Sequence, residues 1–176
     1  MHVLIIAINH QIQSAMIGSM STNGNLEAFE RGQKEAFGEM IRVQIRQRGV
    51  QFVGEEARHG QETVAQRVCG MEQCRHANIE KEPEERQRRQ IPLNYWEDPN
   101  VSEADKARFN CEREAYMINR TITGAGQAEN VILICGRLHR DAIAEDLRRR
   151  EHIVDEIDLQ DQSWYIENWM EHMLDL

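Results

Sequence analysis

Two histidines and two adjacent glutamates each follow an apolar run in this sequence of 176 residues. A histidine that titrates near neutral pH can take a proton from water or from a substrate hydroxyl. A carboxylate beside it fixes its tautomer and raises its basicity. The residues that we predict to be catalytic on these grounds are His10, Glu55, Glu56 and His139.

The same residue types could instead bind a metal. Two imidazoles and one carboxylate leave open coordination positions on a catalytic divalent cation. The alternative prediction is therefore a divalent metal bound by His10, Glu55 and His139.

Charged residues near these positions are predicted to bind the substrate. Arg137 follows the same apolar run as His139 and could stabilise developing negative charge. Arg113 and Glu114 lie together on a predicted helix, where Glu114 flanks the apolar stripe and Arg113 is expected on the solvent side.

The apolar runs predict the sheet that would bring these residues together. Residues 131–135 are apolar without a break and rich in β-branched types, as are residues 3–8. Such runs are typical of central parallel strands that are buried on both faces. Strands leaving adjacent central positions would place His10 and His139 at the carboxyl edge, within about 10 Å of each other.

The remaining pattern alternates short strands with helices, which predicts an α/β fold. We expect one domain over residues 1–176, with a mostly parallel five-stranded sheet of order 3-2-1-4-5 and helices on both faces. The other strands are expected at 50–53, 77–79 and 153–159, and the main helices at 26–49, 63–68 and 102–124. The predicted core stripe of the last of these helices is Ala104, Ala107, Cys111, Ala115, Ile118 and Ile122.

The end of the chain predicts a terminal amphipathic helix over residues 161–176. Its apolar face would be formed by Ile166, Trp169, Met170, Met173 and Leu174. Such a segment is marginal as an isolated helix, so it must pack on its own core or on a second copy. A homodimer through this helix is the prediction.

Composition narrows the class of partner. The formal net charge of −9 argues against non-specific binding to nucleic acid or to an anionic membrane. No apolar stretch approaches the roughly 20 residues that span a bilayer, and the first residues lack the basic region of a signal peptide. A small molecule is the expected partner.

The four cysteines predict a reducing, cytoplasmic compartment. They do not have the spacing of a zinc ribbon, and free cysteines are the expected state. A redox pair of Cys69 and Cys74 is the alternative. No GxGxxG, Walker or GxSxG motif is present, so neither a nucleotide-phosphate loop nor a serine nucleophile elbow is indicated.

Short motifs over most of the chain resemble a small family of bacterial and phage proteins. That family has a strand-end histidine, an acidic pair, a T-V-A-Q-R-V-type helix, a PEER-type segment, an R-E pair and a final C-G-x-x-H. Here these motifs are His10, Glu55–Glu56, Thr63–Val68, Pro83–Arg86, Arg113–Glu114 and Cys135–His139. At a greater distance the sequence is similar to the erythromycin-esterase, ChaN and TIKI/TraB superfamily, which includes hydrolases and haem- or metal-binding proteins.

Three functions follow as hypotheses. The first is a small hydrolase, possible with or without a metal, in which His10 and His139 act as base and electrophile and Glu55 orients them. The second is a protein that binds a metal or small ligand without turnover. The third is an interaction protein, such as a phage or host modulator, that uses its terminal helix.

Overall fold

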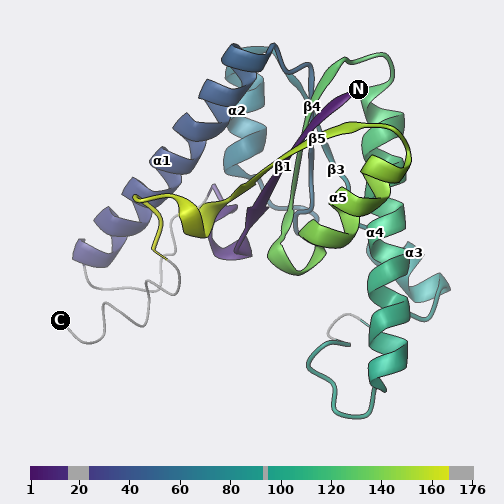
Figure 1. The fold of residues 1–176 in the computed structure, drawn as a ribbon. Coiled ribbons are helices and arrows are strands. Elements are labelled where there is room, and N and C mark those ends of the chain that lie inside the picture. The colour runs from purple at the N-terminus through teal and green to yellow at the C-terminus, as the bar shows by residue number, and fades with distance from the viewer. Residues whose placement is uncertain (16–23, 93–94, 167–176) are drawn as a thin grey trace.

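Five parallel strands form one sheet in the computed structural model, which describes residues 1–15, 24–92 and 95–166. The strands are β1 (His2–Ile8), β2 (Phe52–Glu55), β3 (Arg75–Asn78), β4 (Asn130–Gly136) and β5 (Ile153–Asp158). Helices flank the sheet on both sides (Figure 1). The predicted single α/β sheet with helices is confirmed.

The strand order is β3-β2-β4-β1-β5, so the predicted order 3-2-1-4-5 is wrong in the middle. β1 and β4 are neighbours as predicted, with Ile6 beside Ile134. However, β2 pairs with β4 and β5 pairs with β1. The two central strands are equally apolar and both are buried on two faces. Apolar patterning therefore cannot tell which of them lies next to β2.

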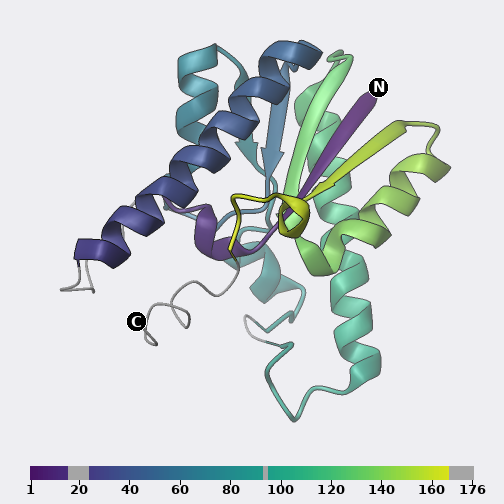
Figure 2. The same ribbon diagram turned by 60° about the vertical axis from the view of Figure 1, so that its left-hand side comes forward.

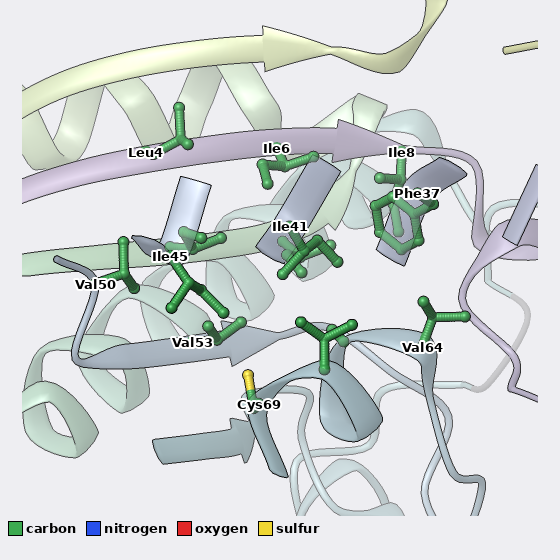
Figure 3. Packing of buried hydrophobic residues seen from close by; sticks show 14 of the residues in the cluster. Leu4, Ile6, Ile8, Phe37, Ile41, Ile45, Val50, Val53, Val64 and Cys69 are labelled. Carbon is green, nitrogen blue, oxygen red and sulfur yellow. The ribbon is translucent and has the colours of Figure 1, made fainter. Parts of the chain in front are cut away.

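One face of the sheet is covered by α1 (Gly24–Arg48) and α2 (Val64–Glu72). The apolar cluster on this face joins Leu4, Ile6 and Ile8 of β1 to both helices (Figure 3). Phe37, Ile41 and Ile45 lie four residues apart on α1 and are buried, as the helical spacing predicts.

The opposite face is covered by α4 (Glu103–Ala125) and α5 (Arg137–Arg149) (Figure 2). Their apolar side chains pack on the other side of the same central strands, where Ile5 and Leu133 are fully buried. Both central strands are therefore buried on two faces. The short helix α3 (Pro83–Arg88) lies beside α4 (Figure 1).

The predicted core stripe of α4 is wrong for most of its residues. Ala104, Ala107, Cys111 and Ala115 are exposed. The buried positions of α4 are Phe109, Arg113, Met117, Ile118, Thr121 and Ala125. Phe109 and Met117 can bury far more apolar area than alanines, so the helix turns that row inward.

Several predicted elements differ at their ends. Residues 159–161 form a 3-10 turn and residues 162–166 are not helical, so the terminal helix is wrong over that stretch. Its remainder, 167–176, lies outside the described residues, and the homodimer stays a prediction.

All four cysteines are free: Cys69 and Cys135 are buried and Cys111 is exposed. Within the described part of the chain, no helix has the length and apolarity to cross a membrane.

Because α4 packs closely on β2, we predict that alanine lowers the free energy of unfolding at one helical glycine and raises it at another. A Cβ atom at Gly124 would lie 2.5 Å from Cζ of the Phe52 ring, whereas a Cβ atom at Gly70 of α2 would have nothing within 4 Å. Gly124→Ala should lower the free energy of unfolding by about 1–3 kcal/mol through overpacking. Gly70→Ala should raise it by about 0.5–1 kcal/mol because alanine favours the helix.

Urea unfolding of both variants against the wild type measures the two changes. A Gly124→Ala variant as stable as Gly70→Ala would contradict the close contact with Phe52.

Candidate active site at the carboxyl edge of the sheet

The carboxylate of Glu56 lies at the centre of the site. Glu56 directly follows β2, and its N–H donates to the carbonyl of Ile134 over 2.8 Å, which extends the pairing with β4. Its side chain is only 3% exposed. Oε2 accepts a hydrogen bond of 2.8 Å from the N–H of Gly136, and Oε1 accepts one of 2.7 Å from Nη2 of Arg113. Two strand ends and one helix therefore hold this buried charge.

His10 and His139 both reach the same oxygen of Glu56. Nε2 of His10 lies 3.6 Å and Nε2 of His139 lies 3.9 Å from Oε1. The two ring nitrogens cannot be farther apart than the sum of these distances. The prediction that the two histidines meet within about 10 Å at the sheet edge is confirmed.

Glu114 orients the His139 ring. His139 is in the first turn of α5, and its Nδ1 lies 2.9 Å from Oε1 of Glu114 on α4. A carboxylate accepts a hydrogen bond at this position, so Nδ1 carries a proton and donates it. Nε2 is then the nitrogen that is left for chemistry, on the side of Glu56.

Gln13 orients the His10 ring in the same way. Its Nε2 donates to Oε1 of Glu55 over 3.0 Å and to the carbonyl of Glu56 over 2.6 Å. Both partners are acceptors, which fixes the orientation of the amide. Oε1 of Gln13 therefore accepts from Nδ1 of His10, over 2.6 Å. Nε2 of His10 also remains for chemistry.

Glu55 does not lie beside the two histidines as predicted, and it reaches His10 only through the amide of Gln13. It is the last residue of β2, so its side chain points to the opposite face from that of Glu56. There the fully buried carboxylate accepts hydrogen bonds from Gln13, from the Thr63 hydroxyl and from His76, whose Nε2 is 2.9 Å from Oε2. The predicted metal ligand set of His10, Glu55 and His139 is therefore not assembled.

Arg113 is buried, contrary to the expectation that it faces solvent. Its guanidinium pairs with Glu56 and with Glu80, and Nη1 donates to the Tyr95 hydroxyl over 3.3 Å. Burial opposes the charge of Arg113, but Glu80 and Glu56 outweigh this and raise its pKa. Arg113 is therefore a permanent cation beside Glu56.

The protonation of Glu56 is controlled by these neighbours. Burial by itself would raise the pKa of the Glu56 carboxyl. The charges of His10, His139 and Arg113, together with the N–H of Gly136, outweigh burial and lower its pKa below the usual value. Glu56 is consequently ionised at neutral pH.

Arg137 lies at the side of the site rather than in it. Its Nε is 3.2 Å from Oδ2 of Asp158 at the end of β5. Since β5 lies beyond β1 at the edge of the sheet, this contact directs Arg137 away from β2 and Glu56. Its predicted role in substrate binding finds no support in this geometry.

The site does not fit a cation well. Among the residues that the structure describes, no group of three or more His, Cys, Asp or Glu side chains is placed to hold a metal ion. Glu56, His10 and His139 come nearest to such a set, but Oε1 of Glu56 is already paired with the Arg113 guanidinium. A second positive charge at that oxygen would be repelled.

Sequence reasoning missed several residues that hold the site. Gln13 lies three residues after His10, a spacing that could have suggested a contact. Thr63 precedes a helix and caps it by accepting from Gln66 N, a signal that the sequence carries. Glu80, Tyr95 and His76 have no such local signal, because their partners are distant in the chain.

A groove of about 540 Å³ opens beside this site, over the ends of β2 and β3. His76, Thr63 and Asn78 line it, whereas His10, Glu56 and His139 do not. We call Glu56, His10 and His139 the Glu56 cluster. This cluster is the stronger candidate for chemistry because two oriented ring nitrogens lie beside one buried carboxylate.

Comparisons with protein-family models, with curated proteins and with solved structures gave no match to this chain. The likeness to the bacterial and phage family and its distant superfamily stays a prediction.

Contact between His10 and Gly136 yields a prediction for the geometry of the site. A Cβ atom at Gly136 would lie 2.8 Å from Nε2 of His10. The backbone at Gly136 is in an ordinary extended conformation, so Gly136→Ala introduces no backbone strain. The variant should displace the His10 ring, because a side-chain end moves more easily than a sheet, and the melting temperature should change little.

Proton NMR of the imidazole Cε1–H signals tests this, with His10→Gln for assignment. The His10 signal should move much more than the His139 signal. An unchanged His10 signal would show that the two residues are not in contact.

Ionisation of Glu56 predicts how stability depends on pH. A carboxyl with a lowered folded pKa stabilises the protein fully above its unfolded pKa of about 4.3 and loses this contribution as the pH falls through the folded value. Glu56→Gln should cost about 1–3 kcal/mol at pH 7, since hydrogen bonds to charge are lost. The difference from the wild type should shrink at about pH 3.5.

Urea unfolding at both pH values measures the effect. Glu62→Gln is the control, because Glu62 pairs with Arg67 while both side chains are 53% exposed. Exposed pairs contribute little, so this variant should match the wild type at both values. An equal loss for Glu56→Gln at both pH values would contradict the ionised state.

Proposed function

We propose that this protein is a small hydrolase that activates water at the Glu56 cluster. The observation that carries the proposal is the convergence of two imidazoles on one buried carboxylate oxygen, each with Nδ1 held by an acceptor. Both rings therefore present Nε2 to the same space. Two oriented imidazoles can act as general base and general acid in one reaction.

His139 is suited to be the base. Its Nδ1–H donates to the Glu114 carboxylate, which holds the ring in the tautomer that leaves Nε2 as the acceptor. Nε2 would take a proton from water, and the oxygen of that water would attack the electrophilic centre of the substrate. The side chain of His139 is 6% exposed, so bulk water is largely excluded from this step.

His10 is suited to be the acid. Its Nδ1 partner is the neutral amide of Gln13, and its side chain is 55% exposed. A protonated Nε2 would give its proton to the leaving group when the bond to the electrophilic centre breaks. The exposed side of His10 is then the side from which a small-molecule substrate enters.

Water is the nucleophile in this proposal because the nearest thiol is unsuitable. Cys135 is fully buried in β4, one residue before Gly136. Burial raises the pKa of the Cys135 thiol well above its usual value, so it stays protonated and unreactive at neutral pH.

Hydrolysis of a panel of carboxylic esters, lactones, amides and phosphoesters tests the proposal. His139→Gln keeps a donor for Glu114 at similar volume but cannot act as a base. It should lower kcat/KM by about 10²–10⁴-fold, the usual worth of a general base. The melting temperature should stay close to that of the wild type.

His2→Gln is the matched control, since His2 is exposed at the other end of β1. It should leave kcat/KM unchanged. Turnover that His139→Gln does not reduce would overturn the assignment.

A metal-assisted reaction is the second candidate, supported by the convergence of two free Nε2 atoms near a carboxylate oxygen. The pairing of that oxygen with Arg113 argues against it. Elemental analysis of the purified protein decides between them. One bound transition metal per chain, with activity lost in chelator and restored by that metal, would replace the metal-free proposal.

A further inference from the structure

Arg86 on α3 is buried without a hydrogen-bond partner. Its side chain is 10% exposed, and neither Nε nor Nη2 has a partner among the residues that the structure describes. The nearest carboxylate oxygen, Oε1 of Glu80, is 3.8 Å from Nε, too far for a hydrogen bond. Nη1 has no partner there either, and it is the guanidinium nitrogen that solvent reaches.

Such unpartnered buried donors are concentrated in one region. In the described ranges, the buried side-chain atoms that lack a partner are Lys81 Nζ, Arg86 Nε and Nη2, Arg113 Nε and Thr121 Oγ1. All but the last belong to cations near the junction of α3 and α4. Buried donors that lack acceptors destabilise a fold, and a missing ion is one of the few explanations for them.

Arg86 is connected to the Glu56 cluster through one carboxylate. Glu80 lies between the two arginines, because Oε2 binds Arg113 while Oε1 faces Arg86. Arg113 in turn donates to Oε1 of Glu56. Arg86 is therefore one carboxylate and one guanidinium away from the oxygen that both histidines approach.

The unpartnered donors at this junction, rather than its net charge, leave room for one more acceptor. The charges of Arg86 and Arg113 are matched by those of Glu56 and Glu80, but neither carboxylate hydrogen-bonds Arg86. Burial lowers the pKa of the Arg86 guanidinium, yet arginine stays protonated at neutral pH. A planar oxyanion that reaches Nη1 can also take the N–H of Nη2, since the two nitrogens form one fork.

We propose that Arg86 binds an anionic oxygen group, a carboxylate or a phosphate, on the substrate of the Glu56 site. That the bound anion belongs to a substrate rests on the proposed function, whereas the binding of the anion does not require turnover. It places the substrate class among small acids or phosphorylated compounds, with the anionic group on the α3 side and the reacting bond near the two histidines.

Equilibrium binding of two simple anions tests the inference. Inorganic phosphate and acetate are titrated separately into the full chain by calorimetry, at constant ionic strength set with potassium chloride. The wild type should bind at least one of them, and the tighter one identifies the anionic group. Arg86→Met should weaken that binding at least tenfold, and Arg86→Lys should fall between, because lysine keeps the charge but not the fork.

Arg88→Met is the matched control, since Arg88 is on the same helix with a side chain that is 74% exposed. It should bind the anion as the wild type does. Without any anion, Arg86→Met should melt at or above the temperature of the wild type, because the variant removes buried N–H donors that have no hydrogen-bond acceptor. A purely structural arginine would show the opposite, a clear loss of stability.

The inference is overturned if the wild type binds neither anion, if Arg86→Met binds as tightly as Arg88→Met, or if Arg86→Met is strongly destabilised. Its failure is distinguishable from failure of the proposed function. Anion binding that survives in His139→Gln, with no hydrolysis of any compound, would remove the hydrolase and keep the anion site. Hydrolysis that needs His139 but not Arg86 would do the reverse.

Discussion

A negative charge buried at the end of β2 is the constraint on which the carboxyl edge of this sheet depends. The Glu56 carboxylate has almost no contact with water, so the fold must supply its donors and its countercharge. β4 supplies the N–H of Gly136, α4 supplies Arg113, and two histidines complete the shell. These groups come from β4, α4, the 3-10 turn after β1 and α5, so four elements besides β2 must be in place before this charge can be buried.

The two adjacent glutamates show how strand geometry divides one sequence feature between two environments. Glu55 faces the α1–α2 side, where Gln13, Thr63 and His76 hydrogen-bond it. Glu56 faces the α4–α5 side and is held by charges. Gln13 connects the two, because one amide group contacts Glu55, the Glu56 carbonyl and His10. The orientation of His10 therefore depends on a carboxylate on the far side of the sheet.

The region around α3 and the first half of α4 differs from the surroundings of Glu56 in how its buried charges are partnered. It is built around a small cluster of Ile91, Tyr95 and Phe109, and it buries cations without enough acceptors. A structure selected for stability alone would not keep such groups, whereas a binding site often does. Through Glu80 and Arg113, this region connects buried donors that lack acceptors to Glu56 and the two histidines.

Sequence alone determined the parallel α/β sheet, its two central strands and the meeting of His10 with His139, because continuous apolar runs and strand-end positions are local features. It could not decide that β4 lies beside β2, since β1 and β4 are equally apolar. Nor could it choose Glu56 over Glu55 or turn Arg113 inward. Glu55 and Glu56 are consecutive, so their side chains point to opposite faces of the sheet, and the rotation of α4 about its axis decides whether Arg113 faces the site. Only the packing of the helices on the sheet decides which of these faces becomes the site and how α4 is rotated.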